Sequence, residues 1–331
     1  MSTLFLKKFQ KSSVFLVFPL FSSPILSPFV QFAKHPALYY SVLMKCYLCP
    51  RKCGADRLVS TGFCKVGYDP VVNIYKLHHG EEPLISGSRG SGTVFFSGCN
   101  LGCIFCQNHD ISFTGKGTTY TPSGLSDIYR DLESQGAHNI NLVTPMHFAP
   151  SVAESLKLSN LSIPVAVNTG SYDSVESLKM LDGLVDIYMP DFKYWSLTLG
   201  SQLAHAQDYR EVCMEAIDEM YRQVGPVVIG DDGLLKRGLI VRHLTLPGQL
   251  FDSKHILEYL CMKYGNNIYI SLMSQYTPMP GLSESFGFLQ KTVNPAHYWQ
   301  LNDLLCNMGQ ANAFVQDTSS IGEELIPDFL K

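Results

Sequence analysis

Short runs of apolar and β-branched residues alternate along this chain with longer segments in which apolar residues recur every three or four positions. The short runs cover residues 93–97, 139–144, 165–169, 185–190, 239–246 and 268–274. Runs of this length and composition, bounded by turn residues, are typical of buried strands. The sequence therefore predicts six strands.

The longer segments are amphipathic and cover residues 123–135, 151–158, 174–181, 208–224 and 253–264. Ser123, which follows Pro122, is the expected N-cap of the first. Strands that alternate with helices indicate βαβ units and a parallel sheet. Right-handed crossovers would curl the six strands into an open α/β fold, a partial (β/α)6 barrel whose strand ends share one mouth.

Three cysteines follow the first predicted strand, and they are the strongest chemical feature of the sequence. Cys99, Cys103 and Cys106 have the spacing C-x3-C-x2-C. A structural zinc ion and an ordinary cubane cluster both take four protein ligands. Three thiolates can hold three irons of a [4Fe–4S] cluster and leave the fourth iron open. A zinc knuckle or three unrelated buried cysteines is the weaker alternative, because thiolates this close are rarely inert.

The composition restricts the class of protein. The chain has 331 residues, a formal net charge of −4, 46% hydrophobic residues and 16% charged residues. These values indicate a globular protein and argue against a nucleic-acid partner bound through a broad basic surface. Ten cysteines grouped in C-x2-C patterns in a chain of this length favour metal binding in a reducing compartment, so a cytoplasmic location is expected.

Residues 1–43 differ from the rest, because no acidic residue precedes Asp56 and an apolar, serine-rich run follows three lysines. Three interpretations stay open. A signal peptide or membrane anchor fits the length, but prolines would break a spanning helix. An organelle presequence fits the missing acids, but Arg is absent before Arg51. We favour an extension without a fold, upstream of a working protein that begins near Met44, and expect no membrane association.

A second group of cysteines lies in a small module at residues 44–92. It has the spacing C-x2-C-x3-C-x10-C, which meets the ligand count of a closed tetrahedral site. Zinc, a rubredoxin-like iron or a second cluster would each fit, and a redox-active centre could pass electrons onward; four small buried hydrophobes is the alternative. The members are Cys46, Cys49, Cys53 and Cys64.

The remaining segments carry weaker patterns. Residues 75–92 are expected to link the module to the first strand, with a glycine-rich surface turn. The barrel is assigned to residues 93–310, and the tail at residues 311–331 has no periodic pattern. Three further cysteines lack partners at metal-ligand spacing and are expected to be core residues: Cys213, Cys261 and Cys306.

The cysteine loop, with Phe105 before its third cysteine, resembles the cluster loop of the radical S-adenosylmethionine superfamily. Later motifs are similar to an uncharacterised branch related to pyruvate formate-lyase activating enzyme. They are Phe-Phe-Ser-Gly-Cys-Asn from Phe95, Asn-Thr-Gly from Asn168, Asp-Ile-Tyr-Met-Pro-Asp-Phe-Lys-Tyr from Asp186 and Arg-His-Leu-Thr-Leu-Pro-Gly from Arg242. The resemblance covers residues 46–310. It implies a radical SAM barrel, a [4Fe–4S] cluster and S-adenosylmethionine, whose amino and carboxylate groups chelate the open iron.

The resemblance also implies roles for individual residues. Cys99, Cys103 and Cys106 would bind the cluster. Six residues match positions that lie along the cofactor and a nearby cation in the activating enzymes: Asn168, Thr169, Met189, Asp191, Lys193 and Arg242. One departure is clear, because Thr144-Pro-Met-His147 stands where those enzymes carry the Gly-Gly-Glu segment that holds the amino group.

Simpler interpretations exist for some of these residues. Asp191 and Lys193 lie two residues apart and could form a solvated ion pair on one strand face. For His147 and His243, a hydrogen-bonded histidine near the barrel rim is at least as good an interpretation as catalysis. No residue is assigned a catalytic role from the sequence.

Three functional hypotheses follow. In the leading one, the cluster reduces S-adenosylmethionine to a 5′-deoxyadenosyl radical that takes hydrogen from a substrate. The substrate would be a glycyl-radical-type protein target, a small molecule or another protein side chain, and the electron donor a protein such as flavodoxin or ferredoxin. The second is an iron–sulfur electron carrier or binding protein that does not cleave S-adenosylmethionine. The third is a zinc-stabilised interaction protein without iron.

Overall fold

The structure is a computed structural model that describes residues 45–279, 281–282, 284–316 and 329. The predictions for residues 1–43 and for most of the C-terminal tail therefore lie outside the described residues. All described residues belong to one compact unit.

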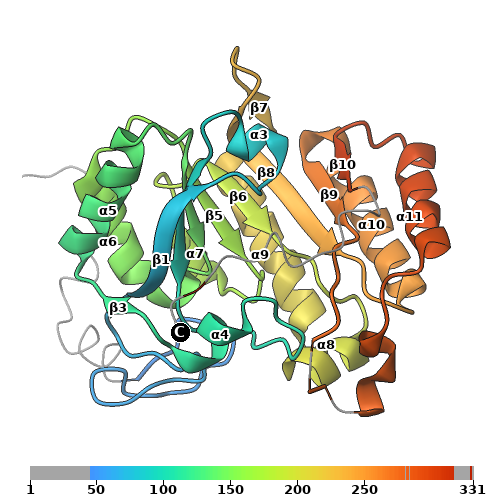
Figure 1. Ribbon diagram of the computed structural model, residues 1–331, viewed down its shortest axis with the longest axis horizontal. Helices are drawn as coiled ribbons and strands as arrows, with labels where there is room; N and C mark the ends of the chain where they lie inside the picture. Colours follow the sequence, from blue (N-terminus) through green and yellow to red (C-terminus); the bar gives the residue numbers. More distant parts are fainter. Residues whose placement is uncertain (1–44, 280, 283, 317–328, 330–331) are drawn as a thin grey trace, which may run out of the picture. The chain divides into compact units, whose positions relative to one another are not determined.

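A mixed, open sheet runs through the described part of the chain in the order β10-β9-β8-β6-β5-β4-β2-β1-β3, with β7 paired to β8 (Figure 1). Its strands are β1 Val71–His78, β2 Ser91–Phe96, β3 Thr118–Thr119, β4 Ile140–Val143, β5 Val165–Thr169, β6 Ile187–Pro190, β7 Val228–Ile229, β8 Leu235–Leu244, β9 Tyr269–Met273 and β10 Ala313–Val315.

All six predicted strands are present, as β2, β4, β5, β6, β8 and β9. They are neighbours in this order, and every pairing between them is parallel. Because β3 and β10 lie at opposite edges and do not pair, the sheet is not closed. The prediction of an open α/β fold of the partial-barrel type is confirmed.

Helices connect the parallel strands and cover the sheet (Figure 1). The five predicted helices are present as α5, α6, α7, α9 and α10. The cap of α5 differs from the prediction, because the side chain of Thr121, not Ser123, accepts the hydrogen bond from Gly124 N–H. The helices are α3 Pro83–Ser86, α4 His109–Thr114, α5 Pro122–Ser134, α6 Ala149–Ser159, α7 Val175–Lys179, α8 Leu197–Ala204, α9 Tyr209–Val224, α10 Leu250–Tyr264 and α11 Pro295–Asn307, with 3-10 turns at Met146–Phe148, Gly265–Asn267 and Glu284–Gln290.

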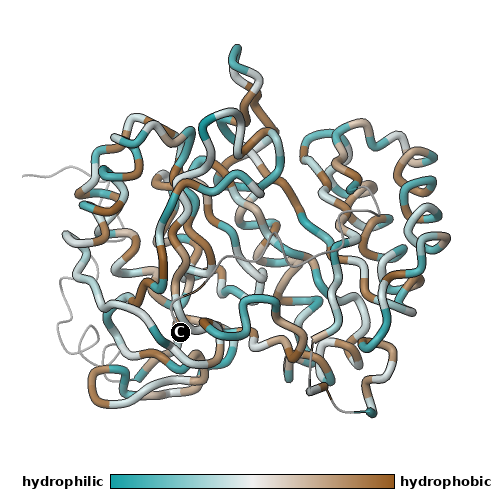
Figure 2. The backbone as a smooth tube through the Cα atoms, in the orientation of Figure 1, coloured by the Kyte–Doolittle hydropathy of each residue, from teal (hydrophilic) through white to brown (hydrophobic). Residues whose placement is uncertain are grey.

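The central strands form because their residues can be buried on both sides. Every residue of β2, β4, β5 and β6 is buried. Outward-facing side chains such as Leu142 and Val167 pack with the apolar faces of α5 and α6, including Leu125 and Leu156, in the main core. Hydrophobic residues accordingly concentrate along these strands (Figure 2). Burial on both faces explains the uninterrupted apolar runs in the sequence.

Two strands extend the sheet beyond the range assigned to the barrel. Residues 75–92 do not form the expected linker, because β1 pairs antiparallel with β2 along its length. The β-branched and aromatic residues of Val71–His78 fit a strand. The sequence analysis did not recognise this pattern, because it assigned the segment to the cysteine module and its linker. At the other edge, β10 pairs parallel with β9, so the start of the tail is also part of the sheet.

The short helix α3 fills the amino-terminal end of the barrel. Its Ile85 is fully buried and packs with residues of three central strands, among them Ala166 of β5, Ile187 of β6 and Ile240 of β8. Phe314 of β10 also packs against this cluster. We call α3 and this cluster the floor of the barrel, because they close the end opposite the cysteine loop.

The three cysteines that were expected in the core differ in their exposure to solvent. Cys213 is buried on α9, as predicted, whereas Cys261 is partly exposed and Cys306 is exposed. The prediction for Cys306 was wrong because α11 contacts the rest of the protein on its other face, through Tyr298, Leu301 and Leu305. Within the described residues, none of the helices combines the length and apolar character that crossing a bilayer requires.

Candidate active site

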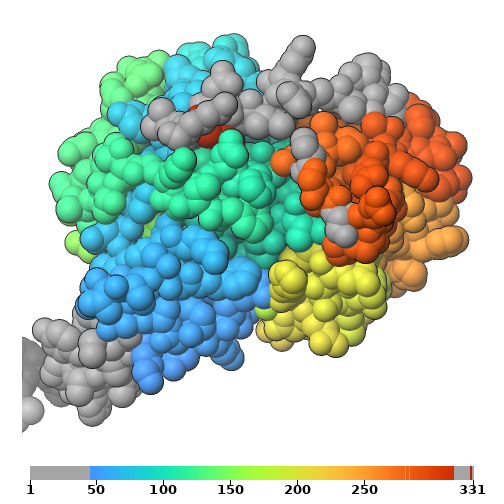
Figure 3. All heavy atoms as spheres, turned by 60° about the horizontal axis from the view of Figure 1, so that its bottom comes forward, coloured from blue at the N-terminus to red at the C-terminus, as the bar shows by residue number. Residues whose placement is uncertain are grey.

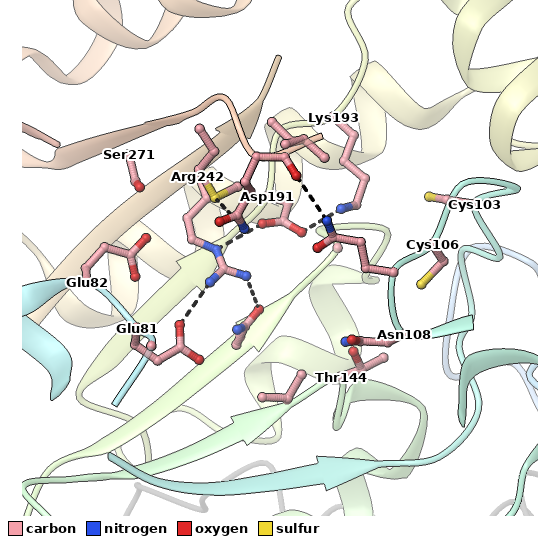
Figure 4. A pocket seen from close by; sticks show the side chains of 18 of the residues that line it. Glu81, Glu82, Cys103, Cys106, Asn108, Thr144, Asp191, Lys193, Arg242 and Ser271 are labelled. Atoms are coloured by element: carbon pink, nitrogen blue, oxygen red, sulfur yellow. Dashed lines mark hydrogen bonds and ion pairs between the residues drawn. The ribbon is translucent and has the colours of Figure 1, made fainter. Parts of the chain in front are cut away.

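A cavity of about 440 Å³ lies inside the barrel between the cysteine loop and the floor. Its volume is in the range of small-molecule sites. The cysteines line one end, and charged side chains from β8, from the loop after β6 and from the β1–α3 segment line the rest (Figure 4). Of the predicted site residues, Cys99, Cys103, Cys106, Asn168, Asp191, Lys193 and Arg242 line it.

The cysteine loop turns immediately after β2. Gly98 has a φ of 81°, a left-handed conformation that favours glycine. A Cβ at this position would also clash with the carbonyl oxygen of Cys64. The end of the strand is therefore packed directly against the N-terminal cysteine module.

Each thiol of the loop has a hydrogen-bond partner. The backbone N–H of Leu101 donates to Cys99 Sγ at 3.3 Å, and the hydroxyl of Tyr194 donates to Cys103 Sγ at 3.1 Å. Cys106 Sγ lies 3.5 Å from Ser112 Oγ. Donors at the sulfurs stabilise thiolates and tune a bound iron cluster.

Without a metal, burial raises the pKa of Cys99 to about 11 and that of Cys103 to about 12. A bound metal reverses this tendency, because it holds coordinating thiols in the deprotonated form. In the described residues no three Cys, His, Asp or Glu side chains converge on one point as a single metal ion requires. The three thiols that line this one cavity are the donors that would hold a cluster, each on a different iron.

Asp191 and Lys193 form a partly buried ion pair, with Lys193 Nζ 2.6 Å from Asp191 Oδ2 and side chains 15% and 20% exposed. Arg242 lies between acceptors: its Nε is 3.1 Å from Asp191 Oδ1 and its Nη2 is 2.8 Å from Asn168 Oδ1. Burial alone would raise the pKa of Asp191, but Lys193 and Arg242 outweigh it and lower that pKa below its usual value. A solvated ion pair is therefore not the right description.

The sequence analysis missed two acidic residues of this cavity, Glu81 and Glu82. Glu81 accepts from Arg242 Nη1 at 3.1 Å and from Asn141 Nδ2 at 2.9 Å. Burial raises the pKa of Glu81 to about 7, although the charge of Arg242 opposes this. Both acids lie in the segment that was assigned to a linker; recognising β1 would have placed them inside the barrel.

Two predicted residues do not reach the cavity. The hydroxyl of Thr169 donates to Asp173 Oδ2 at 2.5 Å, and Met189 packs into the floor of the barrel. Thr144, at the start of the segment that replaces Gly-Gly-Glu, does line the cavity and has a φ of 58°. A left-handed conformation is uncommon for a β-branched residue and is found most often at functional sites.

The two histidines are hydrogen-bonded within the fold. His147 is buried, and one ring nitrogen lies 2.9 Å from the carbonyl oxygen of Ser97; burial lowers its pKa to about 3. His243 is held between Phe192 O, at 2.7 Å, and Ser253 Oγ, at 2.8 Å. Neither lines the cavity, which supports the hydrogen-bonded interpretation.

The second cysteine group lies outside the cavity. Burial raises the pKa of Cys49 to about 12, and the nearby thiols of Cys46, Cys64 and Cys53 contribute to the increase. A Cβ at Gly62 would be 3.2 Å from Cys53 Sγ and 3.5 Å from Cys64 Sγ, so these sulfurs share one neighbour. The thiols are close, but they do not have the geometry of a single-ion site within the described residues. Metal binding here stays a prediction.

Arg51, between Cys49 and Cys53 in sequence, joins this module to the cluster loop. Its guanidinium donates to the carbonyl oxygens of Asn100 and Leu101, both at 2.9 Å, and to those of Ala204 and His205 at the end of α8. The module (blue) accordingly lies against the teal residues that follow it and against α8 (yellow) in Figure 3.

Comparisons with known proteins agree with this site. Residues 86–159 match the family model of a 4Fe-4S single cluster domain, which includes the cysteine loop. The match confirms the predicted [4Fe–4S] cofactor, and the assignment of individual ligands stays a prediction. An uncharacterized protein from Methanocaldococcus jannaschii is 28% identical over 248 residues, which cover 72% of this chain and 68% of the relative.

Among solved structures, the chain resembles native anSMEcpe with bound AdoMet (TM-score 0.46, 12% identity, 66% of this chain) and methylornithine synthase PylB (TM-score 0.41, 15% identity, 70% of this chain and 69% of that one). It also resembles SuiB from Streptococcus suis bound to S-adenosylmethionine (TM-score 0.41, 10% identity, 65% of this chain). The chain spans 61% of the length of anSMEcpe and 44% of that of SuiB.

Proposed function

We propose that this chain is a radical S-adenosylmethionine enzyme, which cleaves S-adenosylmethionine reductively and takes a hydrogen atom from a substrate. The observation that carries the proposal is the cavity itself, which is lined by three thiols at one end and buried charged groups along its length. No fourth cysteine lines it in the described part of the chain. An electron carrier with a closed cluster needs neither the cavity nor the open coordination position.

When bound, the cluster supplies the electron that splits the sulfonium into methionine and a 5′-deoxyadenosyl radical. The chain supplies binding and orientation. Lys193 has three N–H donors and uses one on Asp191, so two are available for the carboxylate and hydroxyl oxygens of the cofactor. Asn168, Asp191 and Thr144 offer further polar groups along the cavity wall, and the barrel shields the radical from water.

The partners are part of the proposal. The electron donor would be a small redox protein such as flavodoxin or ferredoxin. The hydrogen donor would be a protein residue, as in the activating enzymes of glycyl-radical proteins, or a small molecule. The resemblance in the motifs from Asn168, Asp186 and Arg242 supports an activating-enzyme-like subtype.

The test is anaerobic reduction of the reconstituted protein with dithionite in the presence of S-adenosylmethionine. We expect 5′-deoxyadenosine and methionine in equal amounts, and a change in the cluster's electron paramagnetic resonance spectrum when the cofactor is added. An intact cluster whose spectrum is unaffected by S-adenosylmethionine, with no 5′-deoxyadenosine formed, would instead support the electron-carrier hypothesis. Zinc without iron in the anaerobically purified protein would support the interaction-protein hypothesis.

A further inference from the structure

The cavity has a second polar end, at the floor of the barrel. Figure 4 shows Glu81 and Glu82 at the side opposite Cys103 and Cys106. Glu82 is the N-cap residue of α3, and the Ile85 side chain of that helix anchors the floor. The acids are therefore held by a packed element rather than by a free loop.

One acid of the cavity lining lacks a hydrogen-bond partner at a buried oxygen. The lining contains Glu81, Glu82 and Asp191 together with the cations of Lys193 and Arg242, and burial raises the pKa of Glu81 to about 7. Arg242 is fully engaged by Asp191, Asn168 and Glu81. Glu82 Oε2 is buried and has no hydrogen-bond partner among the described residues. A buried carboxylate oxygen without a partner costs free energy unless a ligand supplies the missing donor.

The surroundings of this end suit an organic cation. Phe314 of β10 lines the cavity and packs against the floor. Ser271, the residue paired with Phe314 in the neighbouring strand, adds a hydroxyl. Carboxylates beside aromatic walls are the groups that recognise alkylammonium and guanidinium ions.

The cofactor is a poorer candidate for this role. A [4Fe–4S] cluster held by three thiolates carries one net negative charge in its resting state, and S-adenosylmethionine carries one net positive charge. These two charges balance each other at the cysteine end and leave Glu82 Oε2 without a donor. Buried charges are normally paired.

We propose that Glu82 binds the cationic group of the substrate, an alkylammonium or guanidinium ion. This assignment rests on the proposed function, because it takes the occupant of this end to be the hydrogen donor. The same cation could belong to a free amine or to a lysine side chain of a protein target.

The test measures binding to the cluster-loaded protein with S-adenosylmethionine present. The probes are n-butylammonium against neutral n-butanol, and a lysine-containing tripeptide against its norleucine analogue. We expect the cationic member of at least one pair to bind and the neutral member not to bind. Binding by n-butylammonium alone indicates a small amine as the source, and binding by the peptide alone indicates a protein side chain.

The variants are Glu82→Gln, which keeps the shape and removes the charge, and Glu154→Gln, which removes the same charge from the exposed surface of α6. Glu82→Gln should weaken binding of the cation about 10-fold or more, the loss expected for a charge-assisted hydrogen bond. Glu154→Gln should not change it. A Glu82→Asp variant, which keeps the charge, should retain part of the affinity.

Three results would overturn the inference: no preference for the cationic probes, equal binding by wild type and Glu82→Gln, or a 10-fold weaker affinity of Glu82→Gln for S-adenosylmethionine. The last would make Glu82 a cofactor contact. Formation of 5′-deoxyadenosine is measured separately in the wild type. If no 5′-deoxyadenosine forms while the cation still binds in a Glu82-dependent way, the proposed function is contradicted and the cation site is still supported.

Discussion

The two cysteine groups of this protein differ in what surrounds their sulfur atoms. Cys99, Cys103 and Cys106 face a cavity that also contains ionised side chains. The group of Cys46, Cys49, Cys53 and Cys64 has four thiols near one another and lines no part of that cavity. Three thiols that face a cavity can bind a cluster and leave one metal position open to a ligand. Four thiols outside the cavity instead suit a closed, structural metal site.

The largest expected effect removes a thiol from the cavity. Cys103→Ser should lower cluster content and reduce 5′-deoxyadenosine formation by more than about 100-fold, because loss of a ligand exceeds the effect of losing a residue that supports one. Iron analysis and product quantification measure this. Cys306→Ser, at an exposed cysteine, is the matched control and should behave as wild type. If Cys103→Ser were nearly as active as wild type, the three cavity cysteines would not differ in function from the four cysteines of the N-terminal module.

The second expected effect concerns the other group. Cys49→Ser should lower the thermal unfolding midpoint and the content of any metal bound by the module, because four ligands are needed to close such a site. The rate of 5′-deoxyadenosine formation per intact cluster should stay within about 10-fold of wild type, since no thiol of this group reaches the cavity. A loss of rate per cluster as large as in Cys103→Ser would show that the module takes part in the reaction.

A smaller effect is expected at the residue that joins the two regions. Arg51→Lys cannot reach all four carbonyl oxygens that the guanidinium engages, and each one left unpaired is costly. We expect the free energy of unfolding to fall by about 1–3 kcal/mol, with a changed cluster spectrum. Arg130→Lys, on the exposed face of α5, is the control and should change it by less than about 0.5 kcal/mol. Equal effects in the two variants would mean that Arg51 does not position the cluster loop.

The smallest effect is a pH dependence on the cavity side. Burial raises the pKa of Glu81 to about 7 from its ordinary value of 4.5, so the folded protein binds this proton more tightly than the unfolded chain. The stability from the protonated form is complete below pH 4.5 and is lost as pH rises to about 7. Denaturant unfolding should show the free energy of unfolding of wild type falling relative to that of Glu81→Gln across that interval. A constant difference between the two proteins would contradict the raised pKa.

Much of the fold could be predicted because burial on both faces leaves apolar runs, which is why all six parallel strands were found. The edge strands were harder. β1 mixes polar and apolar residues because one of its neighbours is the two-residue β3, and β10 has only three residues. Missing β1 hid Glu81 and Glu82, whose position depends on an antiparallel pairing that no local pattern specifies.

The site was predicted only in part, because local patterns can be recognised in the sequence and contacts between distant segments cannot. Cysteine spacing is a local property, so the loop could be recognised from sequence. Burial of the Asp191–Lys193 pair and capture of Arg242 by Glu81 are contacts between distant segments, and they could not be read from the motifs. Thr169 and Met189 belong to two motifs whose other residues line the cavity. Thr169 lies on the opposite strand face from Asn168 and bonds to Asp173, whereas Met189 shares the face of Asp191 but packs into the floor.

The close approach of Gly98 to the Cys64 carbonyl has a consequence for how this protein could be dissected or recombined. A truncated protein that begins at residue 93 would lack Cys64 and its neighbours, against which the cysteine loop packs. Chimeras between relatives should fold only when the residues around Cys64 and those around Gly98 come from the same parent. A truncated protein that keeps its activity should begin upstream of Cys46.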